Sequence, residues 1–96
     1  MKHSNEIERY AGPHKQLAED LGNLYYDALT EFLTVFAAKM ARDAEADRGR
    51  GRPRLAAELD ACARHLDDAA RHIQTAWDIC APHVPMTPIA DTTDSS

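Results

Sequence analysis

Two long stretches of this 96-residue chain contain almost no residue that interrupts a helix. The first, residues 13–48, has a proline only at its start and a single glycine, Gly22. The second, residues 53–80, also has its only proline at the start and has no glycine. Proline is tolerated in the first turn of a helix, where its missing N–H would have no partner anyway. The sequence therefore predicts two long helices with these bounds and an all-α fold.

The segment between the two stretches, "DRGRGRPR" from Asp47 to Arg54, predicts a tight turn. We expect Gly49 to adopt the left-handed conformation that commonly ends a helix, and Gly51 to reverse the chain. Pro53 then begins the second helix. Because a short connection makes consecutive helices antiparallel neighbours, residues 13–81 are predicted to form a helical hairpin.

The second helix carries one narrow apolar stripe. Its members follow one another at intervals of three or four residues, which places them on one side of a helix. Polar residues occupy the remaining positions, so this stripe is predicted to be the seam against the first helix. The stripe comprises Leu55, Leu59, Cys62, Leu66, Ala69, Ile73, Trp77 and Cys80.

The first helix is apolar over more than half of its circumference. One partner helix cannot cover so wide a surface, and a second copy of the chain is the simplest source of further cover. We therefore expect a homo-oligomer, and specifically a homodimer in which two hairpins complete a four-helix bundle. The residues predicted to form the interface are Leu24, Tyr25, Leu29, Phe32, Leu33, Phe36 and Met40.

The two ends of the chain differ from the hairpin in composition. Residues 1–12 are predicted to be an N-terminal arm with a short helix, because Asn5 and Glu8 have the spacing of a capping box and Gly12 follows. Residues 82–96 begin with three prolines at intervals of three and continue with small polar residues. This composition predicts a proline-rich tail that is partly disordered.

The turn segment also resembles an AT-hook, a motif in which Arg-Gly-Arg-Pro lies in a narrow A·T minor groove. Here the matching residues run from Arg50 to Pro53, and Arg50 and Arg52 are the candidate DNA contacts. Such a hook needs an extended strand, whereas this segment has to connect two helices. A net charge of −5 also disfavours a polyanionic partner. We prefer the interpretation as a turn and keep weak A·T-rich DNA binding as an alternative.

A second alternative is a metal site on the flank of the second helix. His65, Asp68 and His72 are spaced so that Asp68 can contact either histidine, and Glu31 is a carboxylate on the first helix. Histidine and carboxylate ligands inside a bundle can hold iron or zinc. However, the two histidines lie about 10.5 Å apart along the axis, so one ion would need ligands from another subunit. We expect these residues to be a solvated flank, and we expect no cofactor.

The cysteines and the hydropathy pattern indicate in which cellular compartment the protein is located. Cys62 and Cys80 would lie about 27 Å apart on one helix, so they cannot form a disulfide within a chain. The N-terminal ten residues, "MKHSNEIERY", contain no apolar leader, and the longest apolar run is too short to cross a bilayer. These features predict a cytoplasmic protein without a membrane partner.

The motifs in the sequence favour a protein that binds other proteins over an enzyme. No nucleophile elbow, phosphate-binding loop or cysteine-based zinc spacing occurs in the sequence. The sequence therefore favours a small non-enzymatic interaction or regulatory protein that associates with itself and with a possible further protein partner. Metal binding and DNA binding remain the alternatives.

Overall fold

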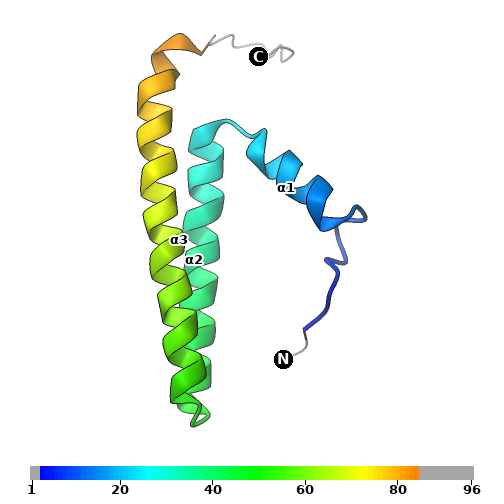
Figure 1. Ribbon diagram of the computed structural model, residues 1–96, viewed down its shortest axis with the longest axis vertical. Coiled ribbons are helices and arrows are strands. Elements are labelled where there is room, and N and C mark those ends of the chain that lie inside the picture. Colours follow the sequence, from blue (N-terminus) through cyan, green and yellow to red (C-terminus); the bar gives the residue numbers. More distant parts are fainter. Residues whose placement is uncertain (1–2, 85–96) are drawn as a thin grey trace.

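The computed structural model describes residues 3–84, and all the regular structure in this range is helical (Figure 1). The two long helices are α2 (Tyr26–Gly49) and α3 (Pro53–Cys80), which pack side by side as an antiparallel hairpin. Helix α1 (His14–Gly22) precedes them, and a 3₁₀ turn, η1 (Ala81–His83), follows. The all-α fold and the pairing of two long helices are confirmed. The predicted disorder of the tail concerns residues that lie mostly outside the described range.

The predicted single helix over 13–48 is wrong, because the helix is interrupted between α1 and α2. Gly22 is the last residue of α1, and glycine is less favourable than alanine in a helix by about 1 kcal/mol. The N–H of Asn23 still donates to Glu19 O at 3.1 Å, but Tyr25 is extended, with ψ 147°. The helix direction therefore changes at Asn23–Tyr25, and α1 diverges from the hairpin (Figure 1).

The predicted short helix in the N-terminal arm is also absent from the described residues. Ser4, rather than Asn5, makes the local bonds: its hydroxyl accepts from the Glu6 N–H at 3.1 Å and donates to Glu6 O at 2.9 Å. A single turn is closed by the N–H of Tyr10, which donates to Ile7 O at 3.0 Å. A helix this short gains too few hydrogen bonds to offset its nucleation cost, so the arm remains a series of turns.

The turn between α2 and α3 begins one residue later than predicted, and its left-handed glycine lies two residues later. Gly49 is helical, and Gly51 is the glycine with positive φ, at 78°. The N–H of Gly51 donates to Arg48 O at 3.1 Å, and the N–H of Arg52 donates to Asp47 O at 2.9 Å. These two bonds define a Schellman motif that ends α2 at Gly49, with Arg50 as the C-cap residue. Pro53 then begins α3, as predicted.

The two glycines of the turn should respond to substitution in opposite directions. Gly51→Ala places a side chain in the left-handed region and should lower the free energy of unfolding by about 1–2 kcal/mol. Gly49→Ala should raise it by about 0.5–1 kcal/mol, because Gly49 is helical and no atom lies within 4 Å of the added Cβ. Urea titrations of both variants measure the difference. Equal effects would show that the left-handed position is not at Gly51.

Alanines form the seam between α2 and α3. The buried apolar residues are Ala37 and Ala44 on α2 and Ala56, Ala63 and Ala70 on α3, each set spaced by seven. Side chains this small allow helix axes to approach to the short end of the usual 8–10 Å range. The predicted seam is wrong in part: Leu55 and Cys62 are exposed, while its other members are half-buried. The residues of α3 that are buried, Ala56, Ala63 and Ala70, each lie one residue after a predicted seam position.

Candidate interaction surface

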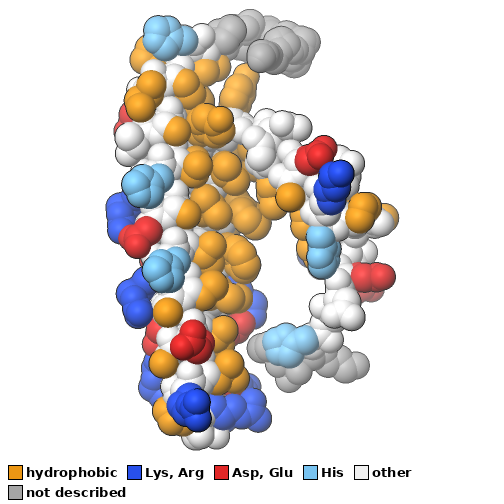
Figure 2. All heavy atoms as spheres, in the orientation of Figure 1, with side chains coloured by type: hydrophobic (Ala, Val, Ile, Leu, Met, Phe, Trp, Pro, Cys, Tyr) orange, Lys and Arg blue, Asp and Glu red, His pale blue; other side chains and the backbone are white. Residues whose placement is uncertain are grey.

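The large apolar residues of α2 and α3 lie on one side of the hairpin. One of them on each helix directly precedes a seam alanine: Phe36 precedes Ala37, and Leu55 precedes Ala56. One residue is a rotation of about 100° in the same direction on each helix. Because the helices are antiparallel and face each other, this rotation brings both sets to the same side, where Figure 2 shows a band of hydrophobic side chains. We call this side the apolar face; it comprises Leu29, Leu33, Phe36, Met40, Leu55, Leu59, Cys62, Leu66 and Ile73.

The apolar face is only partly covered within the chain. Phe36 is 39% exposed and Leu55 is 45% exposed, and no large side chain in the described residues is fully buried. The Phe32 and Phe36 rings contact each other, with centroids 5.8 Å apart. At the other end of the hairpin from the turn, Tyr25 packs against Trp77, with centroids 6.0 Å apart, yet Tyr25 remains 55% exposed. A contiguous apolar surface of this kind is typical of an interaction site.

The predicted interface residues lie on α2 and in the short connection between α1 and α2. Leu24, Tyr25 and Phe36 are exposed, and Leu29, Phe32, Leu33 and Met40 are half-buried. The prediction did not include the residues of α3 that share the face with α2. The sequence signal that bears on them is the set of alanines at intervals of seven on α3, which forms a second stripe beside the leucines and competes with them for the seam. The residues that were missed are Leu55, Leu59, Cys62, Leu66 and Ile73.

The candidate DNA contacts lie in the turn and are engaged within the chain. Arg50 and Arg52 both form ion pairs with one oxygen of Asp47, at 3.2 and 3.4 Å. The Asp47 side chain is only 12% exposed, so these two guanidinium groups supply the charge that its burial requires. Arg48 pairs with Glu45 and with Asp60 of α3. In this conformation the segment is a compact turn and not the extended strand that a minor-groove hook uses.

A pocket of about 440 Å³ adjoins this turn. Its charged lining combines the carboxylates of Asp43 and Asp47 with the guanidinium groups of Arg50 and Arg52. Met40, Leu55 and Leu59 supply its apolar wall, which continues the apolar face, and His3 of the N-terminal arm also lines it. Arg50 and Arg52 pair with Asp47, and Asp43 pairs with Lys39 at 2.8 Å, so these charged groups of the lining already have partners within the chain.

The metal candidates are exposed and are not grouped within one chain. His65, Asp68 and His72 point into solvent from α3, and Asp68 forms an ion pair with Arg71. Glu31 is exposed on α2. Among residues 3–84, no group of three or more His, Cys, Asp or Glu side chains has an arrangement that could hold a metal ion.

Comparisons with models of known protein families, with curated proteins and with solved structures find no match to this chain. Hydropathy adds one finding: over the part of the chain that the structure describes, no helix combines the length and apolar character that a membrane crossing requires.

Proposed function

We propose that this protein is a small, non-enzymatic helical module that functions by self-association through its apolar face. Two hairpins pack face to face and form a four-helix bundle. The observation that supports this proposal is the partition of side chains between the seam and the face. Alanines make the closest contact within the chain, whereas most of the leucines, Phe36 and Met40, which could build a stable core, lie on one open side.

The size of the apolar face supports an association of this kind. Helix α2 has 24 residues and is about 36 Å long, and two adjacent helices are about 18 Å wide. The face therefore offers roughly 650 Å² per copy, close to the ~800 Å² per partner of a typical stable interface. At about 25 cal/mol per Å² of apolar area, its burial contributes far more than the alanine seam can.

The residue pattern of the face favours a partner with the same helical repeat. The α2 residues of the face, from Leu29 to Met40, are spaced by four, three and four, and the α3 residues from Leu55 to Leu66 are spaced in the same way. Side chains with this spacing interlock with those of a neighbouring helix that has the same seven-residue period. A second copy of the hairpin meets that requirement on both helices. The outer surface of the bundle then remains available to a further protein partner.

Sedimentation equilibrium at micromolar concentration tests the proposal. We expect a species with twice the chain mass of 10.7 kDa, and helical circular dichroism that decreases as the protein is diluted. Dilution should reduce the helical signal because the apolar face and the fold are stabilised together. A single-chain mass at micromolar concentration, with a helical signal that does not change on dilution, would refute self-association as the function of this face.

A further inference from the structure

Helix α1 lacks a packing partner within its own chain. None of its residues is buried, and it makes only sparse contact with α2 and α3. Leu17 and Leu21 are its only half-buried residues, one turn apart on the same side. The space-filling view shows a gap between the lower part of the hairpin and the N-terminal arm that leads into α1 (Figure 2). A short helix therefore stands beside an uncovered apolar surface without closing on it.

A helix of this length is not expected to be stable without tertiary contacts. Helix α1 has nine residues, whereas isolated helices shorter than about 12–15 residues are marginal in water. Local bonds hold the arm together: the Tyr10 hydroxyl donates to the Asp20 carboxylate, and Gln16 Nε2 donates to the other carboxylate oxygen at 3.0 Å. The bond from Tyr10 lowers the pKa of Asp20. All of these bonds are exposed to water, so their stabilising effect is small.

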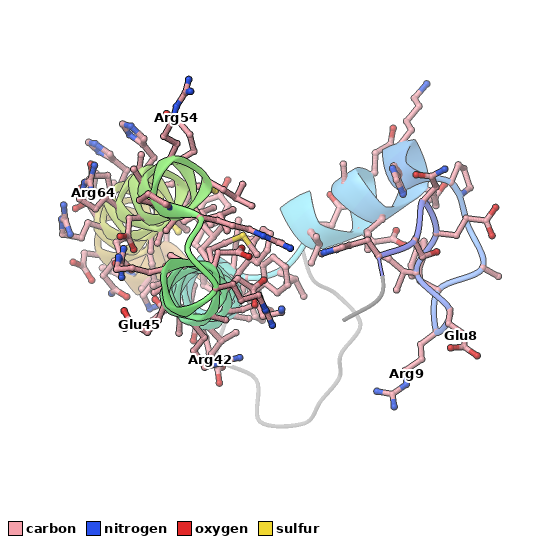
Figure 3. The ribbon with its side chains drawn as sticks, turned by 90° about the horizontal axis from the view of Figure 1, so that it is seen from below. Glu8, Arg9, Arg42, Glu45, Arg54 and Arg64 are labelled. Atoms are coloured by element: carbon pink, nitrogen blue, oxygen red, sulfur yellow. The ribbon has the colours of Figure 1, made fainter. Side chains whose placement is uncertain are left out.

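The position of α1 relative to the apolar face indicates which molecule packs against α1. Seen along the hairpin, Arg64 and Glu45 point away from the side on which α1 stands (Figure 3). Arg64 follows Ala63, and Glu45 follows Ala44, so both residues lie on the side of the seam opposite to the apolar face. Helix α1 therefore projects from the same side of the hairpin as the apolar face. Any hairpin that packs on this face must lie beside α1.

We infer that α1 is a clasp for the second copy: in the dimer, Leu17 and Leu21 of each chain pack against the hairpin of the other chain. This inference rests on the proposed self-association and specifies how the interface is completed. The face alone provides roughly 650 Å² per copy, somewhat less than a typical stable interface, and the leucine side of α1 adds to it. The contact also explains why a nine-residue helix forms where its own chain buries none of its residues.

A pair of double substitutions in the full-length chain tests the clasp. Leu17→Ala with Leu21→Ala should raise the dimer dissociation constant at least about tenfold, which corresponds to about 1.4 kcal/mol. The matched control, Lys15→Ala with Glu19→Ala, changes the opposite side of α1 and should leave the dissociation constant within about twofold. Both constants are measured by sedimentation over a dilution series.

Hydrogen exchange on the unmodified protein provides a test that does not depend on a variant. The amides of α1 should be protected at concentrations well above the dissociation constant and should lose that protection in the monomer, before the amides of α3 do. If the leucine variant dimerises as tightly as the unmodified protein, or if α1 is equally protected in the monomer, the clasp is refuted while self-association stands. If the unmodified protein is a folded monomer, both proposals are refuted.

Discussion

Phe36→Glu is expected to abolish the dimer at micromolar concentration. The Phe36 ring lies in the middle of the apolar face and is 39% exposed in the single chain, so the substitution leaves the alanine seam intact. In the proposed bundle the new carboxylate would be buried without a partner, and an unpaired charge in an apolar contact costs several kcal/mol. Sedimentation should therefore show the mass of one chain, and circular dichroism should show a helix content that no longer depends on concentration.

Val35→Glu is the matched control for this prediction. Val35 is the neighbouring residue on α2 and is more exposed, at 56%, but a rotation of about 100° takes it off the apolar face. The same charge at this position should shift the dissociation constant by less than about threefold, because an exposed charge keeps its hydration. Equal loss of the dimer in both variants would mean that the interface is not the face defined by Phe36.

Ala63→Leu is expected to have the largest effect on the hairpin itself. Ala63 is 7% exposed at the centre of the α3 side of the seam. A leucine there has no space between the two backbones, so α2 and α3 must move apart or adopt strained rotamers, at a cost of about 1–3 kcal/mol. A chain with so thin a core has little stability to lose, so we expect a large drop in the midpoint of urea unfolding.

The same substitution at an exposed alanine of α3 separates packing from helix propensity. Ala57 lies on the polar side of α3, and Ala57→Leu adds the same atoms without meeting α2. We expect a change within about 0.5 kcal/mol. If Ala57→Leu and Ala63→Leu destabilise the protein equally, the alanines are not the close contact that the structure indicates.

The parts of the fold that local residue chemistry determines could be predicted from the sequence. Pro53 begins α3 and the run before Pro82 ends at Cys80, because proline restricts the backbone whatever the tertiary context. The helical hairpin followed from these limits. The break at Asn23–Tyr25 could not be predicted in the same way, because one glycine in a helical run is usually tolerated and the outcome depends on which surfaces the flanking helices find.

The candidate surface was predicted on α2 and missed on α3 for a physical reason. Leu55, Leu59 and Leu66 form a stripe with the same seven-residue period as Ala56 and Ala63, displaced by one residue. A ranking by hydrophobicity selects the leucines as the seam, because a leucine gains more from burial than an alanine does. Close approach of two helices favours the alanines instead, because small side chains let the backbones come together. The sequence contains both stripes, and only the packing of α2 against α3 decides between them.

The alanine seam also determines how such a chain can change over evolutionary time. At Ala37, Ala44, Ala56, Ala63 and Ala70, almost every substitution adds volume where none is free, whereas the apolar face can exchange leucine, isoleucine, methionine and phenylalanine at modest cost. We therefore expect divergent descendants of a common ancestor to keep small residues at this seven-residue interval after their larger apolar residues have drifted. The sequence similarity that remains between such proteins would then be found at the alanine positions and not at the positions of the large apolar residues.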